Sequence, residues 1–284
     1  MVALLTAIAL ALGAGCGGNS SALSVLRTTD FHALAFSPND SNIVFFGHHN
    51  GIMRSDDGGQ TWSSLVNRSN FDAMALGVSR SDPSQVYLAG HDIFQRSTNG
   101  GASWQPIRHN LPGTDIHGFA MSLDVSDRLY AFVVRFGLFQ SDDGGQVWHK
   151  LSSQLPQDIM ALAAAEGMPE ILYAGSMNSG VLKSIDGGQN WARAVNGLGS
   201  LTVTALSVDP NVPLTVYACT DGGLYKSTNG GTSWDKLPFP GDNAISVAVS
   251  PAKPQVVLAI AIKEKQGLVY KSEDGGLSWG KRAR

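Results

Sequence analysis

Cysteine is nearly absent from this chain, and its scarcity excludes several classes of protein. Only two cysteines, Cys16 and Cys219, occur among 284 residues. Neither a disulfide framework nor a cysteine-based metal site can be built from them. Cys219 follows the apolar residues Val216, Tyr217 and Ala218, so we expect a buried, unreactive thiol there.

Charge is also sparse, and neither sign is in large excess. Charged residues make up 15% of the chain, and the formal net charge is −3. No basic cluster suited to nucleic acid and no basic amphipathic stretch suited to a membrane surface is present in the sequence. We therefore expect no nucleic-acid partner. Helical periodicity is lacking as well, which favours an all-β fold.

What the chain does contain is an octapeptide that occurs six times. The first copy, residues 55–62, reads Ser-Asp-Asp-Gly-Gly-Gln-Thr-Trp. A repeat of about 43 residues is typical of a ring or stack of similar units. The repeat-defining residues are Ser55, Asp57, Gly59 and Trp62, then Asn99 and Trp104, Asp143 and Trp148, Asp186 and Trp191, Asn229 and Trp234, and Asp274 and Trp279.

Each octapeptide is expected to form a tight hairpin turn. Asp or Asn followed by two glycines suits backbone positions with positive φ, which glycine adopts without a Cβ clash. The Ser hydroxyl and the Asp or Asn side chain can accept hydrogen bonds from nearby backbone N–H groups. The Trp ring can then fold back over the turn, which stabilises it by about 2–3 kcal/mol per copy.

The octapeptide resembles the Asp-box, S-x-D-x-G-x-T-W, also called the bacterial neuraminidase repeat. Proteins with this repeat include sialidases, xyloglucanase-type glycoside hydrolases, sortilin-like and photosystem II assembly factor-like propellers, and bacterial lipoproteins labelled glycosyl hydrolase. The resemblance implies a hairpin between strands three and four of a propeller blade, at the periphery and away from the ligand face. Asn99 and Asn229 depart from the usual Asp.

Each repeat reads as four short strands, so we expect a six-bladed β-propeller over residues 31–284. Large residues alternate with Ala, Gly or Ser in the first strand of each repeat. One face of every sheet is then bulky and the other small, which lets neighbouring blades pack closely. Whole blades begin and end this region, so we expect the ring to close locally; whether residues 23–26 add an edge strand stays open.

The N-terminal segment indicates export. Residues 1–16 combine a short apolar run with small residues before Cys16. The run is too short to span a bilayer and matches a signal peptide. The segment resembles a bacterial lipobox, which implies lipidation of Cys16 and a cell-envelope location; a plain secretory signal with an incidental cysteine is the alternative. A start upstream of Met1 also stays open. Residues 17–30 are expected to form a flexible linker.

Candidate binding residues lie where a propeller usually presents its ligand face. The starts of the inner strands and the loops between second and third strands carry most of the histidines within blades one to three. A one-sided polar cluster at a channel mouth predicts a binding site. A solvated rim, with the histidines as loop polar groups, is the alternative. The candidates are His32, Asp72, His117, His48, His49, His91, Asp92 and Arg135.

Neither a metal nor another cofactor is expected from the sequence. His32 and His117 lie two blades apart, so one ion could not easily bind both. His48 and His49 are adjacent and point to opposite faces if the strand is extended.

Catalysis has weak support. The arginine triad and free tyrosine that a sialidase needs are not found. A xyloglucanase-like enzyme needs two opposed carboxylates, for which Asp72 with Asp92 or Asp115 are available. That family, however, holds its substrate between two propellers, and this chain has one. We therefore expect a monomeric, non-catalytic binding or assembly module for a peptide, protein or glycan, anchored to the membrane only through lipid; a glycoside hydrolase is the alternative.

Overall fold

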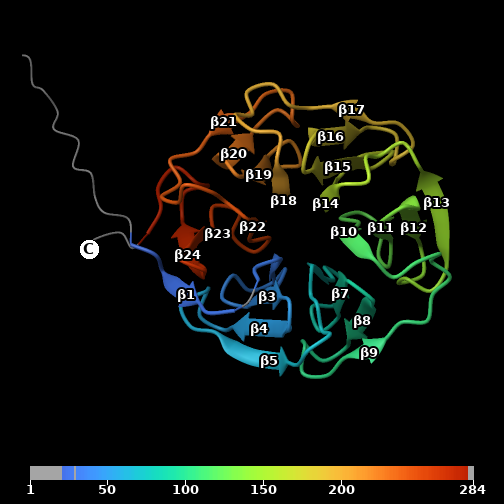
Figure 1. Ribbon diagram of the computed structural model, residues 1–284, viewed down its shortest axis with the longest axis horizontal. Coiled ribbons are helices and arrows are strands. Elements are labelled where there is room, and N and C mark those ends of the chain that lie inside the picture. The colour runs from blue at the N-terminus through green and yellow to red at the C-terminus, as the bar shows by residue number, and fades with distance from the viewer. Residues whose placement is uncertain (1–20, 29, 281–284) are drawn as a thin grey trace, which may run out of the picture.

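Six four-stranded sheets surround a central axis, as the expected β-propeller requires (Figure 1). The computed structural model describes residues 21–28 and 30–280. The predicted signal peptide and Cys16 lie outside the described residues. Every described element is a β-strand, so no helix of the described part could cross a membrane.

Blades one to three each use four strands that are consecutive in the chain. From the axis outward, the three blades contain β2 (Leu34–Phe36), β3 (Val44–His48), β4 (Gly51–Ser55) and β5 (Ser63–Asn67); β6 (Ala75–Val78), β7 (Val86–Gly90), β8 (Ile93–Ser97) and β9 (Gln105–Pro106); and β10 (Ile116–Met121), β11 (Leu129–Val133), β12 (Gly137–Ser141) and β13 (Trp148–Ser152).

Blades four and five follow the same plan, while blade six takes its outer strand from the other end of the chain. Their strands are β14 (Ile159–Ala165), β15 (Ile171–Ser176), β16 (Gly180–Ser184) and β17 (Ala192–Arg193); β18 (Val203–Val208), β19 (Val216–Thr220), β20 (Gly223–Ser227) and β21 (Asp235–Lys236); and β22 (Ser246–Val249), β23 (Val257–Lys263), β24 (Gln266–Ser272) and β1 (Ser24–Leu26).

The prediction of local ring closure is wrong. Strand β1 pairs antiparallel with β24, so the N-terminal segment completes the sixth blade (Figure 1). The linker predicted for residues 17–30 therefore contains a strand of the ring. Leu26 of β1 is 1% exposed and packs into the core between blades six and one. The two ends of the propeller are thus held together by backbone hydrogen bonds and apolar packing.

The octapeptides form the expected hairpin turns. In the first copy, the Ser55 hydroxyl accepts a hydrogen bond from Gly59 N–H at 2.8 Å and donates one to Asp57. Gly58 and Gly59 have φ of 72° and 92°, which a side chain would disfavour. The Trp62 indole N–H donates to the Gly59 carbonyl at 3.1 Å, so its ring folds back over the turn.

The turns also join neighbouring blades. A Cβ on Gly145 would lie 2.7 Å from Cε1 of Phe94 in the preceding blade. The hydrophobic core consists of six clusters, each shared by two adjacent blades. Cys219 is a free, fully buried thiol in one of these clusters, as predicted, and burial raises its pKa.

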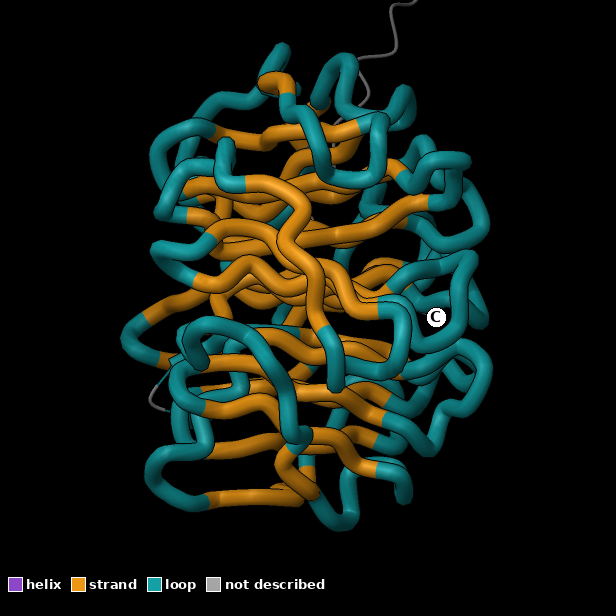
Figure 2. The backbone as a smooth tube through the Cα atoms, turned by 90° about the vertical axis from the view of Figure 1, so that its right-hand side faces the viewer, coloured by secondary structure: helices purple, strands orange, loops and turns teal. Residues whose placement is uncertain are grey.

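Loops gather on the two opposite faces of the disc, with the strands between them (Figure 2). The turns between first and second strands and the Asp-boxes share one face, because Gly58 N–H donates to the Asn42 carbonyl and Gly144 N–H to that of Asp127. The starts of the inner strands and the loops between second and third strands share the other face, which we call the mouth face. The Asp-boxes therefore lie away from the predicted binding residues.

Candidate functional site

The central channel is narrow. Inner strands of all six blades line a cavity of about 90 Å³. This volume is smaller than that of a cavity that binds benzene, about 150 Å³, so the channel is too small for a peptide or an oligosaccharide. The residues nearest the mouth face are His32, Met74, His117, Met160, Thr204 and Ser246. A partner can therefore be recognised at the mouth and not inside the channel.

One predicted site residue at the start of an inner strand does not line the channel. Met74 takes the place predicted for Asp72. Asp72 lies two residues before Met74 in the chain. It is 3% exposed and lies between Phe71 and Ala73. The Ala73 N–H donates to the His48 carbonyl of blade one, which holds this segment against the neighbouring blade.

Asp72 is the centre of a cluster of histidines. Its Oδ2 lies 2.5 Å from His91 Nδ1 and 3.4 Å from His49 Nδ1. Its Oδ1 lies 3.0 Å from His32 Nε2, at ion-pair distance but without the angle of a hydrogen bond. One buried carboxylate thus contacts three imidazoles from blades one and two.

A second carboxylate extends the cluster into blade three. His91 Nε2 lies 3.0 Å from His117 Nε2 and 3.5 Å from Asp115 Oδ1. His117 Nε2 lies 3.0 Å from the same Asp115 oxygen. The loop that carries His91 reaches the next blade because His91 and Asp115 form an isolated antiparallel bridge. Blades two and three are therefore joined at the mouth by side chains that the repeat does not require.

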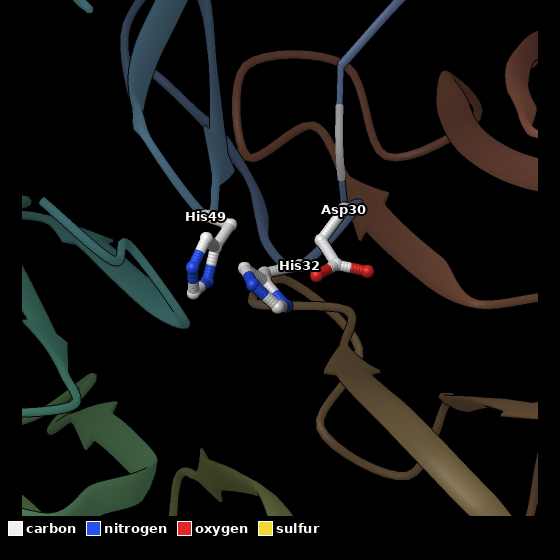
Figure 3. A group of neighbouring side chains, drawn as sticks. All are labelled: Asp30, His32 and His49. Carbon is white, nitrogen blue, oxygen red and sulfur yellow. The ribbon is translucent and has the colours of Figure 1, made fainter. Parts of the chain in front are cut away.

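Asp30, His32 and His49 form a third part of the cluster (Figure 3). One ligand atom from each lies within 4.8 Å of the others. His49 projects from the hairpin between β3 and β4, and the His32 ring lies between His49 and Asp30 (Figure 3). We call the seven residues of these three parts the mouth cluster: Asp30, His32, His49, Asp72, His91, Asp115 and His117.

The surroundings shift the pKa values of two members of the cluster. Burial alone would raise the pKa of Asp72, but its interactions with His32 and His91 outweigh burial and lower the pKa to about 2. Burial lowers the pKa of His117, although Asp115 opposes the effect. Near neutral pH the cluster therefore contains an ionised Asp72 beside a neutral His117, a combination suited to binding cations or hydrogen-bond donors.

Three predicted site residues do not join the cluster. His48 is buried, stacks on Phe46 and has its pKa lowered first by burial. Asp92 is exposed and accepts a hydrogen bond from the Thr114 hydroxyl at 2.7 Å. Arg135 is exposed in a left-handed turn with φ of 71°. His48 is the last residue of β3, whereas His49 lies in the turn that follows and is exposed, so the two side chains are in different surroundings.

The sequence prediction missed Asp30. A signal for it exists, because four blades place Asp two positions before the residue that lines the channel. These residues are Asp30, Asp72, Asp115 and Asp158, which precede His32, Met74, His117 and Met160. Asp158 faces its own blade, where it accepts hydrogen bonds from Ser176 and Asn178. An alignment of blade two on Met74 would have revealed this pattern.

Comparison with known proteins supports the repeat and the fold. The BNR/Asp-box repeat matches residues 53–64. No curated protein matches the whole sequence. A GH74 xyloglucanase from Xanthomonas campestris superposes with a TM-score of 0.64 at 19% identity, over 91% of this chain and 46% of that chain. The present chain thus spans less than half of that enzyme.

Two other similar structures belong to protein assemblies. YCF48 bound to D1 peptide has a TM-score of 0.56 and 19% identity, over 92% of this chain and 87% of that chain. A chain of the Mitotic Checkpoint Complex has a TM-score of 0.60 and 12% identity, over 96% of this chain and 99% of that chain. At these identities the likeness shows the fold alone. The chain carries the BNR/Asp-box repeat and folds as a six-bladed β-propeller, similar in fold to GH74 enzymes and to YCF48.

Proposed function

We propose that the protein is a non-catalytic binding module that receives a peptide or protein segment at its mouth face, over blades one to three. The observation that carries this proposal is the convergence of four histidines and three aspartates there, above a channel too small for a peptide. None of these side chains belongs to the Asp-box turns. Two proteins of similar fold, YCF48 and the checkpoint propeller, occur with a peptide or in a complex.

A hydrolytic role fits the site less well. An inverting glycosidase needs one protonated carboxyl group as an acid and one carboxylate as a base, about 6.5–9.5 Å apart. Asp72, with a pKa of about 2, stays ionised and is nearly enclosed by imidazoles. It cannot supply a proton near neutral pH, and a carboxylate with so low a pKa is a weak general base. A glycan that binds without being hydrolysed would be detected in the binding test described next.

The binding proposal can be tested with displayed peptides and a glycan panel. We expect selected ligands to compete with one another, and His91→Ala to weaken their binding about tenfold, a loss of the size that marks an important contact. The matched control is Gln189→Ala, an exposed position in the Asp-box of blade four on the opposite face. Ligands that respond equally to both variants would contradict the proposal. Glycan turnover that Asp72→Asn abolishes would favour the hydrolase instead.

We further propose that the module is exported to the bacterial cell envelope and carries lipid on Cys16. The support is the short apolar run and small residues that precede this cysteine. Growth with a labelled fatty acid should label the wild-type protein and Cys219→Ser, but not Cys16→Ser. Label retained by Cys16→Ser would contradict the anchor.

A further inference from the structure

Three ligand atoms of the mouth cluster converge on one point between blades two and three. His91 Nε2, His117 Nε2 and Asp115 Oδ1 are separated by 3.0, 3.0 and 3.5 Å. Zinc binds nitrogen and carboxylate ligands at about 2.0–2.2 Å, so neighbouring ligands of a tetrahedral ion lie about 3.3–3.6 Å apart. Movements of a few tenths of an ångström would therefore turn this triangle into three corners of such a site.

The second nitrogen of His91 is held as it is in metal-binding histidines. An Asp side chain is ordinarily a carboxylate near neutral pH and can then only accept hydrogen bonds, so the short contact assigns the proton to the Nδ1 of His91. The lone pair of His91 is then on Nε2, which faces Asp115 and His117. A carboxylate that fixes the tautomer of a ligand histidine is typical of zinc sites.

One ligand atom of this triangle lacks a hydrogen-bond partner. Asp115 Oδ1 is buried and makes no well-directed hydrogen bond, although His117 Nε2 lies 3.0 Å from it. Among the described residues, all ion pairs of Asp72 and Asp115 are made with histidines and none with Lys or Arg. The side chains of His91 and Asp115 are 48% and 47% exposed, so an ion could reach them from solvent.

We propose that His91, Asp115 and His117 bind one divalent transition-metal ion of the zinc class, with Asp72 as a positioning residue. Two imidazoles and a carboxylate favour zinc over calcium or magnesium, which prefer oxygen ligands. Three protein ligands leave one position for water or for a donor atom of a partner. Asp30, His32 and His49 form a looser group, because the ion-pair contacts of His32 and His49 are to Asp72 and not to Asp30. Metal binding is independent of the partner proposed above and can be measured without one.

Zinc affinity of the full chain, without a polyhistidine tag, tests this site by competition with a chromophoric chelator. We expect one Zn²⁺ per chain, more than about 100-fold weaker binding in His91→Gln and His117→Gln, and a loss of about 10- to 100-fold in Asp72→Asn. His149→Gln, on the exposed side of β13, is the matched control and should bind as the wild type does. The visible spectrum of bound Co²⁺ should change in Asp115→Asn, which reports coordination directly.

Circular dichroism of the metal-free variants separates a lost ligand from a lost fold. Should His117→Gln not fold, Asp115→Asn provides the same comparison. Wild-type affinity equal to that of the His91→Gln/His117→Gln double variant would overturn the proposal. It would also be overturned if His49→Gln lost as much affinity as His91→Gln, since the ion would then lie at the looser group.

Discussion

Replacing Gly90 with alanine is expected to destabilise the protein by about 3 kcal/mol and to displace Asp72. A Cβ on Gly90 would lie 1.9 Å from the Asp72 carbonyl oxygen, a contact with backbone that no rotamer change can relieve. The strand end and the segment that carries Asp72 would have to separate. Chemical denaturation measures the free energy of unfolding. The zinc binding and the partner binding proposed for the mouth cluster should be weakened as well.

Gly222→Ala is the matched control for Gly90→Ala. Gly222 lies in the corresponding hairpin of blade five, and a Cβ there would have no neighbour closer than 3.6 Å. We expect this variant to stay within about 0.5 kcal/mol of the wild type. Equal stability of the two variants would show that the backbone of Asp72 does not pack against Gly90.

Replacing Leu26 with alanine is expected to lower the free energy of unfolding by about 2–5 kcal/mol. Leu26 is 1% exposed, and its side chain fills the core between the last and the first blade. Truncation removes apolar contacts at the place where the ring closes, so β1 should detach more readily from β24. Chemical denaturation with tryptophan fluorescence follows the transition, because Trp62 packs against the same cluster.

The neighbouring residue provides the control for this closure. Val25 belongs to the same strand but is 43% exposed, so Val25→Ala should change stability by no more than about 0.5 kcal/mol. If Leu26→Ala and Val25→Ala were equally mild, the strand β1 would not hold the ring closed.

The fold was predictable because the signal repeats. Six hairpin turns recur at a regular spacing, each with a tryptophan equivalent to Trp62. Any one of these repeats therefore predicts the same sheet as the others. The closure was missed because β1 has three residues and carries no part of the repeat. The hydrophobic pattern of a short segment does not predict its pairing with a distant strand. Ser24 and Val269, which pair, lie at opposite ends of the chain.

The candidate site was predictable in composition but not in geometry. The sequence places His32, His91 and His117 on one face of blades one to three, and the structure brings them together around Asp72 and Asp115. Whether Asp72 or Met74 occupies the channel position of blade two was harder to predict, because residues two apart point to the same side of an extended strand; only the comparison with the other blades favours Met74. The displacement of His48 from the site follows from side-chain alternation, which the sequence does contain.

The tautomer of His91 tests most directly whether the mouth residues form one cluster centred on Asp72. Long-range ¹H–¹⁵N correlation spectra of the metal-free protein at about pH 8, where histidines are neutral, distinguish the two ring nitrogens. We expect one set of His91 signals, from the tautomer whose proton is on Nδ1 and is hydrogen-bonded to the Asp72 carboxylate. A proton on Nε2, or an averaged mixture of the two tautomers, would contradict it.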